Sequence, residues 1–224
     1  MARAALFDVD GTLVDTNHLH VVTWWEALRQ AGHHVPTTAI HRAIGLGSDD
    51  LLVHLLGEKK GRRAAEAGEV SAAHSTLYGE YRERLTAFEG AGDLLRALDS
   101  RGWRIVLVTS ASDEELGALR RAIGADEVIR DVASADDVSE GKPAPDPVEH
   151  ALELVGADAG QSVFVGDSVW DMKAAVRAGV RAVALLSGGI PRADLEEAGA
   201  GTVHTDPAAL LASLNRDGGP FAEN

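Results

Sequence analysis

The chain has 224 residues, 45% of them hydrophobic, which argues against disorder and allows one large core or a core with a smaller inserted domain. Its net charge of −14 argues against nucleic acid and anionic membranes as partners, although a metal and a few cations would still admit an anionic substrate. The absence of cysteine excludes disulfides and thiolate chemistry, and the lack of a signal-peptide core or long apolar run predicts a cytoplasmic protein.

The first predicted element is a short apolar strand, Ala4 to Phe7, which is followed by the run Asp8-Val9-Asp10-Gly11-Thr12. Strand residues alternate between faces, so Asp8 and Asp10 point the same way. Two adjacent carboxylates repel, and a cation is expected beside them, most simply Mg²⁺. One carboxylate can attack as a nucleophile and the other can carry protons.

Two other interpretations of this run are weaker. A calcium loop of the EF-hand type needs Gly at its sixth position and Glu at its twelfth, and those positions hold Leu13 and Leu19. A hairpin turn explains Gly11 but not Asp8.

Residues 16–84 contain helical patterns and no convincing strand. One helix is predicted to end at Gly32, and its apolar face is expected at Leu19, Val22, Trp25 and Leu28. A second is predicted over 51–56 behind the acidic cap 48–50, and a longer helix over 62–84. We therefore predict a helical cap domain at 16–85, inserted into a core formed by 1–15 and 86–224.

From residue 85 onward, predicted strands and helices alternate. The strands are expected at 103–108, 128–133, 162–165 and 181–186, and the helices at 91–100, 113–123, 147–155 and 171–178. This alternation of apolar strands and helices predicts an α/β fold with a doubly wound parallel sheet. Functional groups in such sheets gather at the carboxyl ends of the strands.

Three further groups stand at or near predicted strand ends. Thr109 and Ser110 follow one strand, Asp167 follows another with Asp171 four residues later, and Lys142 precedes a proline that favours an extended backbone. Each has a simpler interpretation alone: a helix cap, a helix start or a solvated lysine. Together with Asp8 and Asp10 they supply a nucleophile, an acid/base, a hydroxyl, a cation and a further metal ligand.

These motifs, in this order, resemble those of the haloacid dehalogenase superfamily, in the helical-cap (C1) branch that includes phosphoglycolate phosphatases and β-phosphoglucomutases. The resemblance spans essentially the whole chain. It implies that Asp8 forms a phospho-aspartate and that Asp10 protonates the leaving oxygen and then activates water. It also implies Mg²⁺ bound by the Asp8 side chain, the Asp10 backbone carbonyl and Asp167, with Asp171 supporting the metal site.

The resemblance further implies that Thr109 and Lys142 hold the phosphoryl group together with backbone amides, including that of Ser110. The physics of phosphoryl transfer agrees, because such catalysis is mostly positioning and charge stabilisation. We therefore expect a Mg²⁺-dependent phosphatase acting on a small phosphorylated metabolite. We expect it to be a monomer or a weak homodimer.

Within the predicted cap, Thr16, His20 and Trp24 resemble residues placed in the same way in the mutases and in many phosphatases. His20 is expected to orient Asp10 when the cap closes. Of the adjacent tryptophans, we expect Trp24 to line the site and Trp25 to pack in the core of the cap.

The sequence also leaves other activities to be weighed against a phosphatase. A haloacid dehalogenase is disfavoured because those enzymes lack the second aspartate, which this chain has as Asp10. A phosphonoacetaldehyde hydrolase forms a Schiff base on a cap lysine. The candidates here, Lys59 and Lys60, lie in a polar turn where a lowered lysine pKa is not expected. A sugar-phosphate mutase needs a cation near the cap loop 45–50, which is acidic here, although Arg42 could supply one. A receiver-like signalling protein or phospho-ligand binder is disfavoured because Asp10 is retained.

Overall fold

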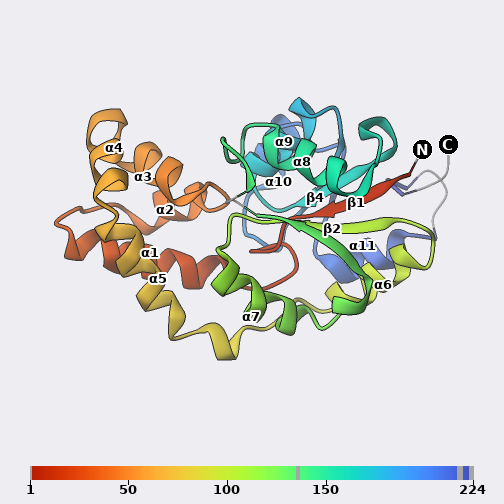
Figure 1. The fold of residues 1–224 in the computed structure, drawn as a ribbon, viewed down its shortest axis with the longest axis horizontal. Helices are drawn as coiled ribbons and strands as arrows, with labels where there is room; N and C mark the ends of the chain where they lie inside the picture. The colour runs from red at the N-terminus through yellow and green to blue at the C-terminus, as the bar shows by residue number, and fades with distance from the viewer. Residues whose placement is uncertain (1, 135–136, 216–218, 222–224) are drawn as a thin grey trace.

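The protein, described by a computed structural model over residues 2–134, 137–215 and 219–221, is built on one six-stranded sheet (Figure 1). The strand order is β3-β2-β1-β4-β5-β6 and every pairing is parallel, which confirms the predicted fold class. The strands are β1 (Ala4–Phe7), β2 (Arg104–Val108), β3 (Ile129–Ala133), β4 (Val163–Gly166), β5 (Arg181–Leu185) and β6 (Thr202–His204). The order reverses between β1 and β4, where such sheets bind ligands beyond the strand ends.

Helices cover both faces of the sheet because its strands are apolar on both sides. In β1, Ala5 and Phe7 face one hydrophobic cluster, and Ala4 and Leu6 face the other. The first cluster includes α6 (Ala91–Asp99), α7 (Asp113–Ile123) and α11 (Pro207–Ser213), and the second α8 (Asp146–Val155), α9 (Val169–Arg177) and α10 (Arg192–Glu197). Figure 1 shows these two sets of helices above and below the sheet. Short 3₁₀ turns lie at Asp126–Val128 and Ala159–Gln161.

A separate group of helices is inserted between β1 and β2 and lies to one side of the sheet (Figure 1). It comprises α1 (Asn17–Gln30), α2 (Thr37–Ala43), α3 (Ser48–Leu56), α4 (Glu58–Ala67) and α5 (Glu69–Gly79), with a 3₁₀ turn at Arg82–Arg84. These helices share their own hydrophobic cluster. Within the described part of the chain, no helix combines the length and apolarity needed to cross a membrane.

The prediction of one long helix over 62–84 is wrong. Gly68 has φ 69°, in the left-handed region that glycine adopts most easily, and it separates α4 from α5. The second helix then ends at Gly79. The short helix α2 was not predicted.

The predicted apolar face of α1 is correct at Leu28 but wrong at Val22 and Trp25. Val22 and Trp25 are 47% and 36% exposed, whereas Val21 and Trp24 are buried together with Leu28. Both sets of residues have helical spacing, so sequence periodicity alone could not separate them. Packing against α5 decides the face, because the Trp24 ring stacks on His74 of that helix with centroids 4.1 Å apart.

The two segments that connect the inserted helices to the sheet lie side by side. Val14 forms an antiparallel bridge with Ala87, and the backbone amide of Asp15 donates to the carbonyl of Thr86 at 3.0 Å. The division into a core of 1–15 and 86–224 and a cap of 16–85 stays a prediction. The term "cap" is used from here on for helices α1–α5 and the loops between them.

Candidate active site

The ends of the central strands bring most of the predicted site residues together. Asp8 follows β1, Thr109 follows β2 and Asp167 follows β4, and each side chain is nearly inaccessible to solvent. Lys142, from the loop before α8, and Asp171, in the first turn of α9, are also buried. Because parallel strands end at the same edge of the sheet, residues from opposite ends of the sequence converge there.

Lys142 is the centre of a buried charge network. Its Nζ lies 2.5 Å from Asp8 Oδ1 and 2.9 Å from Asp171 Oδ1, and it also donates to the backbone carbonyl of Val108 at 2.9 Å. Although burial acts to lower the pKa of Lys142, the two carboxylates raise it above its usual value. Burial raises the pKa of Asp8 to about 7, against the opposing effect of Lys142. Lys142 is therefore a fixed cation beside the predicted nucleophile.

The residues around Asp8 fit a magnesium ion. Asp8, Asp167 and Asp171 each offer a carboxylate oxygen, and these atoms lie within 4.8 Å of one another. Burial and the neighbouring carboxylates raise the pKa of Asp167, and Lys142 supplies only one positive charge against the three acidic groups. Buried carboxylate oxygens with excess negative charge are the ligands that Mg²⁺ prefers. The Asp10 side chain lies outside this group, and its backbone carbonyl as a ligand stays a prediction.

Three residues around Asp167 were not singled out from the sequence. The Thr12 hydroxyl lies 2.9 Å from Asp167 Oδ1, and Asn17 Nδ2 donates to Asp167 Oδ2 at 2.8 Å. A Cβ built on Gly188 would lie 1.6 Å from Asp167 Oδ2. Thr12 belongs to the first motif and could have been proposed, whereas nothing near Asn17 or Gly188 in the sequence points to Asp167.

The Asp10 carboxylate faces the cap rather than the acidic group. Its Oδ1 accepts a hydrogen bond from the Thr16 hydroxyl at 2.6 Å and lies 3.2 Å from His20 Nε2. Burial acts to raise the pKa of Asp10, but the contacts with His20 and Thr16 prevail and lower it. The same contact raises the pKa of His20 despite its burial. The structure thus places His20 against Asp10, and its role in orienting Asp10 when the cap closes stays a prediction.

The ring of His20 contacts the ring of a second histidine, His74. His20 Nδ1 lies 3.2 Å from His74 Nε2, and burial, with the nearby His20, lowers the pKa of His74 to about 3. A neutral His74 can accept a hydrogen bond from His20 while His20 Nε2 donates to Asp10. Tyr78 stacks on His20 and Trp24 stacks on His74, each at 4.1 Å between ring centroids. The sequence gives no sign of His74 as a partner, because it lies 54 residues away from His20 along the chain.

Asp8 and Asp10 open into a pocket of about 400 Å³ between the sheet and the cap. The pocket is lined by residues of the core and by the cap segment 44–51, which includes the start of α3, and Trp24 and Ser110 both contribute to its wall. The Ser110 hydroxyl approaches the carbonyl of Gly45 at 3.5 Å, so core and cap meet at the rim. Thr109 lies beneath, where its hydroxyl accepts from the backbone amide of Ala111 and keeps its own proton available.

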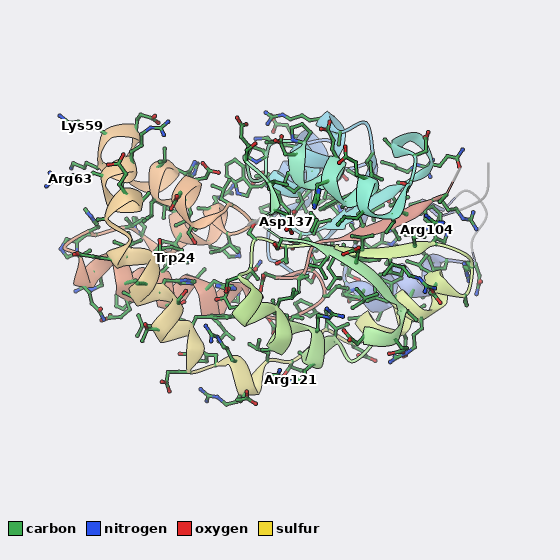
Figure 2. The ribbon with its side chains drawn as sticks, viewed as in Figure 1. Trp24, Lys59, Arg63, Arg104, Arg121 and Asp137 are labelled. Atoms are coloured by element: carbon green, nitrogen blue, oxygen red, sulfur yellow. The ribbon has the colours of Figure 1, made fainter. Side chains whose placement is uncertain are left out.

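Arg42 is not brought to this pocket. Its guanidinium pairs with Asp194 of α10 at 2.7 Å, it is 59% exposed, and it lines a different hollow. Lys59 lies at the outer end of α4, far from the strand ends and from Trp24 (Figure 2). The structure therefore supports neither residue at the site.

Comparisons with known proteins agree with this geometry. The family model of haloacid dehalogenase-like hydrolases matches residues 2–179. A phosphoglycolate phosphatase of Rhodospirillum rubrum is 30% identical over 221 residues, which cover 94% of this chain and 90% of the relative. The crystal structure of a hydrolase from Pseudomonas syringae is similar with a TM-score of 0.88 and 35% identity, covering 95% of this chain and 97% of that one.

A β-phosphoglucomutase structure from Clostridium difficile shares the fold, with a TM-score of 0.80 and 18% identity, and 92% of each chain is covered. The family match spans both the first strand with its two aspartates and the segment that carries Asp167 and Asp171. The resemblance inferred from the motifs is confirmed. The chain belongs to the haloacid dehalogenase-like hydrolase family.

Proposed function

We propose that the protein is a Mg²⁺-dependent phosphatase that hydrolyses the phosphate monoester of a small metabolite through a phospho-aspartate. The observation that carries this proposal is the arrangement at the pocket floor. A buried carboxylate, Asp8, touches the fixed cation Lys142, while Asp10 is held separately by His20 and Thr16. The name of the Rhodospirillum rubrum relative, a phosphoglycolate phosphatase, supports the same class of reaction.

In the first step, an Asp8 carboxylate oxygen forms a bond to phosphorus as the bond between phosphorus and the ester oxygen breaks. Asp10 gives a proton to the departing oxygen, so the alcohol leaves neutral. In the second step, Asp10 takes a proton from a water molecule that attacks the phospho-aspartate. The water oxygen bonds to phosphorus as the bond between phosphorus and the Asp8 oxygen breaks, which releases inorganic phosphate and restores both side chains.

The surrounding groups stabilise charge. Lys142, the Thr109 hydroxyl and the Ser110 amide would hold the phosphoryl oxygens. Asp8 and Asp167 would hold the metal ion, with Asp171 fixing Lys142 and the start of α9. When bound, Mg²⁺ neutralises part of the phosphoryl charge and lets an anionic ester approach Asp8.

The test is hydrolysis of p-nitrophenyl phosphate by the purified protein with Mg²⁺ and after removal of Mg²⁺ by a chelator. We expect turnover that is lost in excess chelator and restored by added Mg²⁺. Undiminished turnover without a divalent cation would overturn the metal requirement. No turnover in either condition would favour a phospho-ligand binding protein.

The mutase alternative loses its support from Arg42. A mutase must hold a second phosphate at the cap side of the pocket, and Arg42 is committed to Asp194 instead. The described residues that line the pocket include no lysine and no arginine. The likeness to the mutase structure, at 18% identity, concerns the fold alone.

A further inference from the structure

The wall of the pocket around Asp8 and Asp10 is acidic on both its cap side and its core side. Asp49 and Asp50 come from the first turn of α3, and Glu115 comes from α7 of the core. The other polar groups on the wall are mainly hydroxyls, from Ser48, Ser75, Ser110, Ser112 and Ser139. We call this surface, formed by Asp49, Asp50 and Glu115 with the serine hydroxyls, the acidic wall. It lies beyond Asp8, where the leaving group of a bound ester would extend.

Glu115 supplies an unused acceptor in this wall. The residue is 7% exposed, and its Oε2 is occupied by the backbone amide and the hydroxyl of Ser112 at 3.1 Å and 3.2 Å. Its Oε1 is buried and has no hydrogen-bond partner. A buried carboxylate without a cationic partner is costly, and a positive or neutral ligand group beside it is favoured over a second negative charge.

Asp50, on the cap side of the pocket, also favours a neutral or positive ligand group over a negative one. Partial burial and the adjacent Asp49 raise its pKa against the opposing effect of Arg62, so the two neighbouring carboxylates already repel one another. A Cβ on Gly141 would lie 3.6 Å from Asp50 Oδ2, so the core loop faces Asp50 closely across the rim. A cation or a neutral hydroxyl would be favoured here, and a second anion would add to the repulsion.

The cations around the wall have partners elsewhere, and Arg62 of α4, which acts to lower the pKa of Asp50, contacts Glu58. Lys142 is held between Asp8 and Asp171, His20 faces Asp10, and Arg42 pairs with Asp194 outside the pocket. An anionic group on the substrate, other than its phosphoryl group, would therefore meet like charges, and the described residues of the lining offer it hydroxyl groups but no lysine or arginine.

We propose that the preferred substrates are phosphate monoesters whose leaving alcohol carries hydroxyl or amino groups and no second negative charge. This inference rests on the proposed phosphatase function. It separates this chain from the activity for which its Rhodospirillum rubrum relative is named, because phosphoglycolate carries a carboxylate on its leaving group.

Three two-carbon esters of nearly equal size test it: phosphoethanolamine, 2-hydroxyethyl phosphate and phosphoglycolate. Their second carbon carries a positive, a neutral and a negative group. With Mg²⁺ present, we expect kcat/KM for the first two to exceed that for phosphoglycolate by at least about tenfold, because the acidic wall repels only the third. p-Nitrophenyl phosphate is measured in parallel as a test of the chemistry alone.

The double variant Asp50→Asn/Glu115→Gln removes two charges from the wall, while the amide oxygen of the new glutamine keeps an acceptor for Ser112. We expect it to raise the kcat/KM of phosphoglycolate relative to 2-hydroxyethyl phosphate by about fivefold or more. The control Glu66→Gln/Glu153→Gln removes two exposed charges outside the pocket, and we expect it to leave this ratio within about twofold. Because Asp50 is exposed, Asp50→Asn alone keeps the test available if the double variant does not fold.

The outcomes separate the two proposals. Preference for phosphoglycolate by a protein that hydrolyses p-nitrophenyl phosphate would overturn the inference and leave the phosphatase function standing. An equal response of the wall variant and the control would also overturn it, since net charge rather than the wall would set the ratio. Inactivity towards every ester, p-nitrophenyl phosphate included, would overturn the proposed function itself.

Discussion

The floor of the pocket, by which we mean Asp8 with the buried Lys142, Asp167 and Asp171 around it, and the acidic wall both contain carboxylates, but in different surroundings. On the floor, Asp8 and Asp167 are at most 4% exposed, and each has hydrogen-bond or ionic partners. On the acidic wall, Asp49 and Asp50 lie on the exposed start of a helix, and of its three carboxylates only Glu115 is buried, where it is paired with Ser112. Burying a carboxylate is costly unless it is paired, so the floor requires Lys142 and its neighbours, whereas exposed carboxylates need no such partners. The positions of the floor residues are therefore fixed by their partners, while the wall, which we propose selects the leaving group, is less constrained.

The same contrast separates the sheet from the cap. Sheet residues near the site are held between two hydrophobic clusters, whereas the cap has a smaller cluster of its own, to which the core contributes Trp170. The cap contributes His20, His74 and the segment 44–51 to the lining of the pocket. If this comparison is correct, changes on the floor should abolish the reaction, and changes in the cap should weaken the cap before they affect the sheet.

The largest effect is expected from Asp8→Asn. An amide is not a nucleophile of comparable strength, so we expect kcat to fall by about 10⁴-fold or more. The measurement is p-nitrophenyl phosphate turnover, with the exposed Asp126→Asn as the matched control. Substantial turnover by purified Asp8→Asn would remove Asp8 from the nucleophilic role and break the contrast between floor and wall.

Asp10→Asn should slow hydrolysis by about 10²–10⁴-fold, the usual contribution of a general acid–base group. Because water activation is lost as well, phosphorylated protein should accumulate after acid quenching. A kcat within about twofold of the unchanged protein would assign the proton transfer to another group.

Leu28→Ala should destabilise the cap by about 2–5 kcal/mol, because Leu28 is fully buried in the cap cluster and its loss leaves a cavity. Hydrogen exchange should show reduced protection in α1 and α5 and little change in the sheet. Val22→Ala is the control, since Val22 is 47% exposed and should change stability by no more than about 0.5 kcal/mol. Equal loss of protection in the sheet would show that cap and core unfold as one unit.

Gly188→Ala should weaken Mg²⁺ activation by about 10–100-fold, the usual effect of disturbing a group that orients a metal ligand. The new Cβ would overlap Asp167 Oδ2 and displace that carboxylate. The Mg²⁺ concentration for half-maximal activity is the measurement, and Gly117→Ala is the control, because its Cβ meets only a side-chain atom at 3.6 Å. Unchanged midpoints for both variants would argue against Asp167 as a ligand.

The sequence by itself determined the elements whose signals are local. The apolar run before Asp8 predicted β1, the alternation after residue 85 predicted the parallel sheet, and strand ends located Thr109 and Asp167. These predictions succeeded because buried parallel strands are continuous apolar runs and because their carboxyl ends share one edge.

The tertiary structure decided which face of a helix is buried, where several faces fit the sequence equally well, and which residues far apart in the sequence come into contact. It placed Trp24 rather than Trp25 in the cap cluster, and it committed Arg42 to Asp194. It also set His74 against His20 and left no room for a side chain at Gly188. Helical periodicity fixes the spacing of apolar residues but not which face is covered, and contacts between residues far apart in sequence leave no local trace. Only the packing of the folded chain, within the cap, within the core and between them, could settle these points.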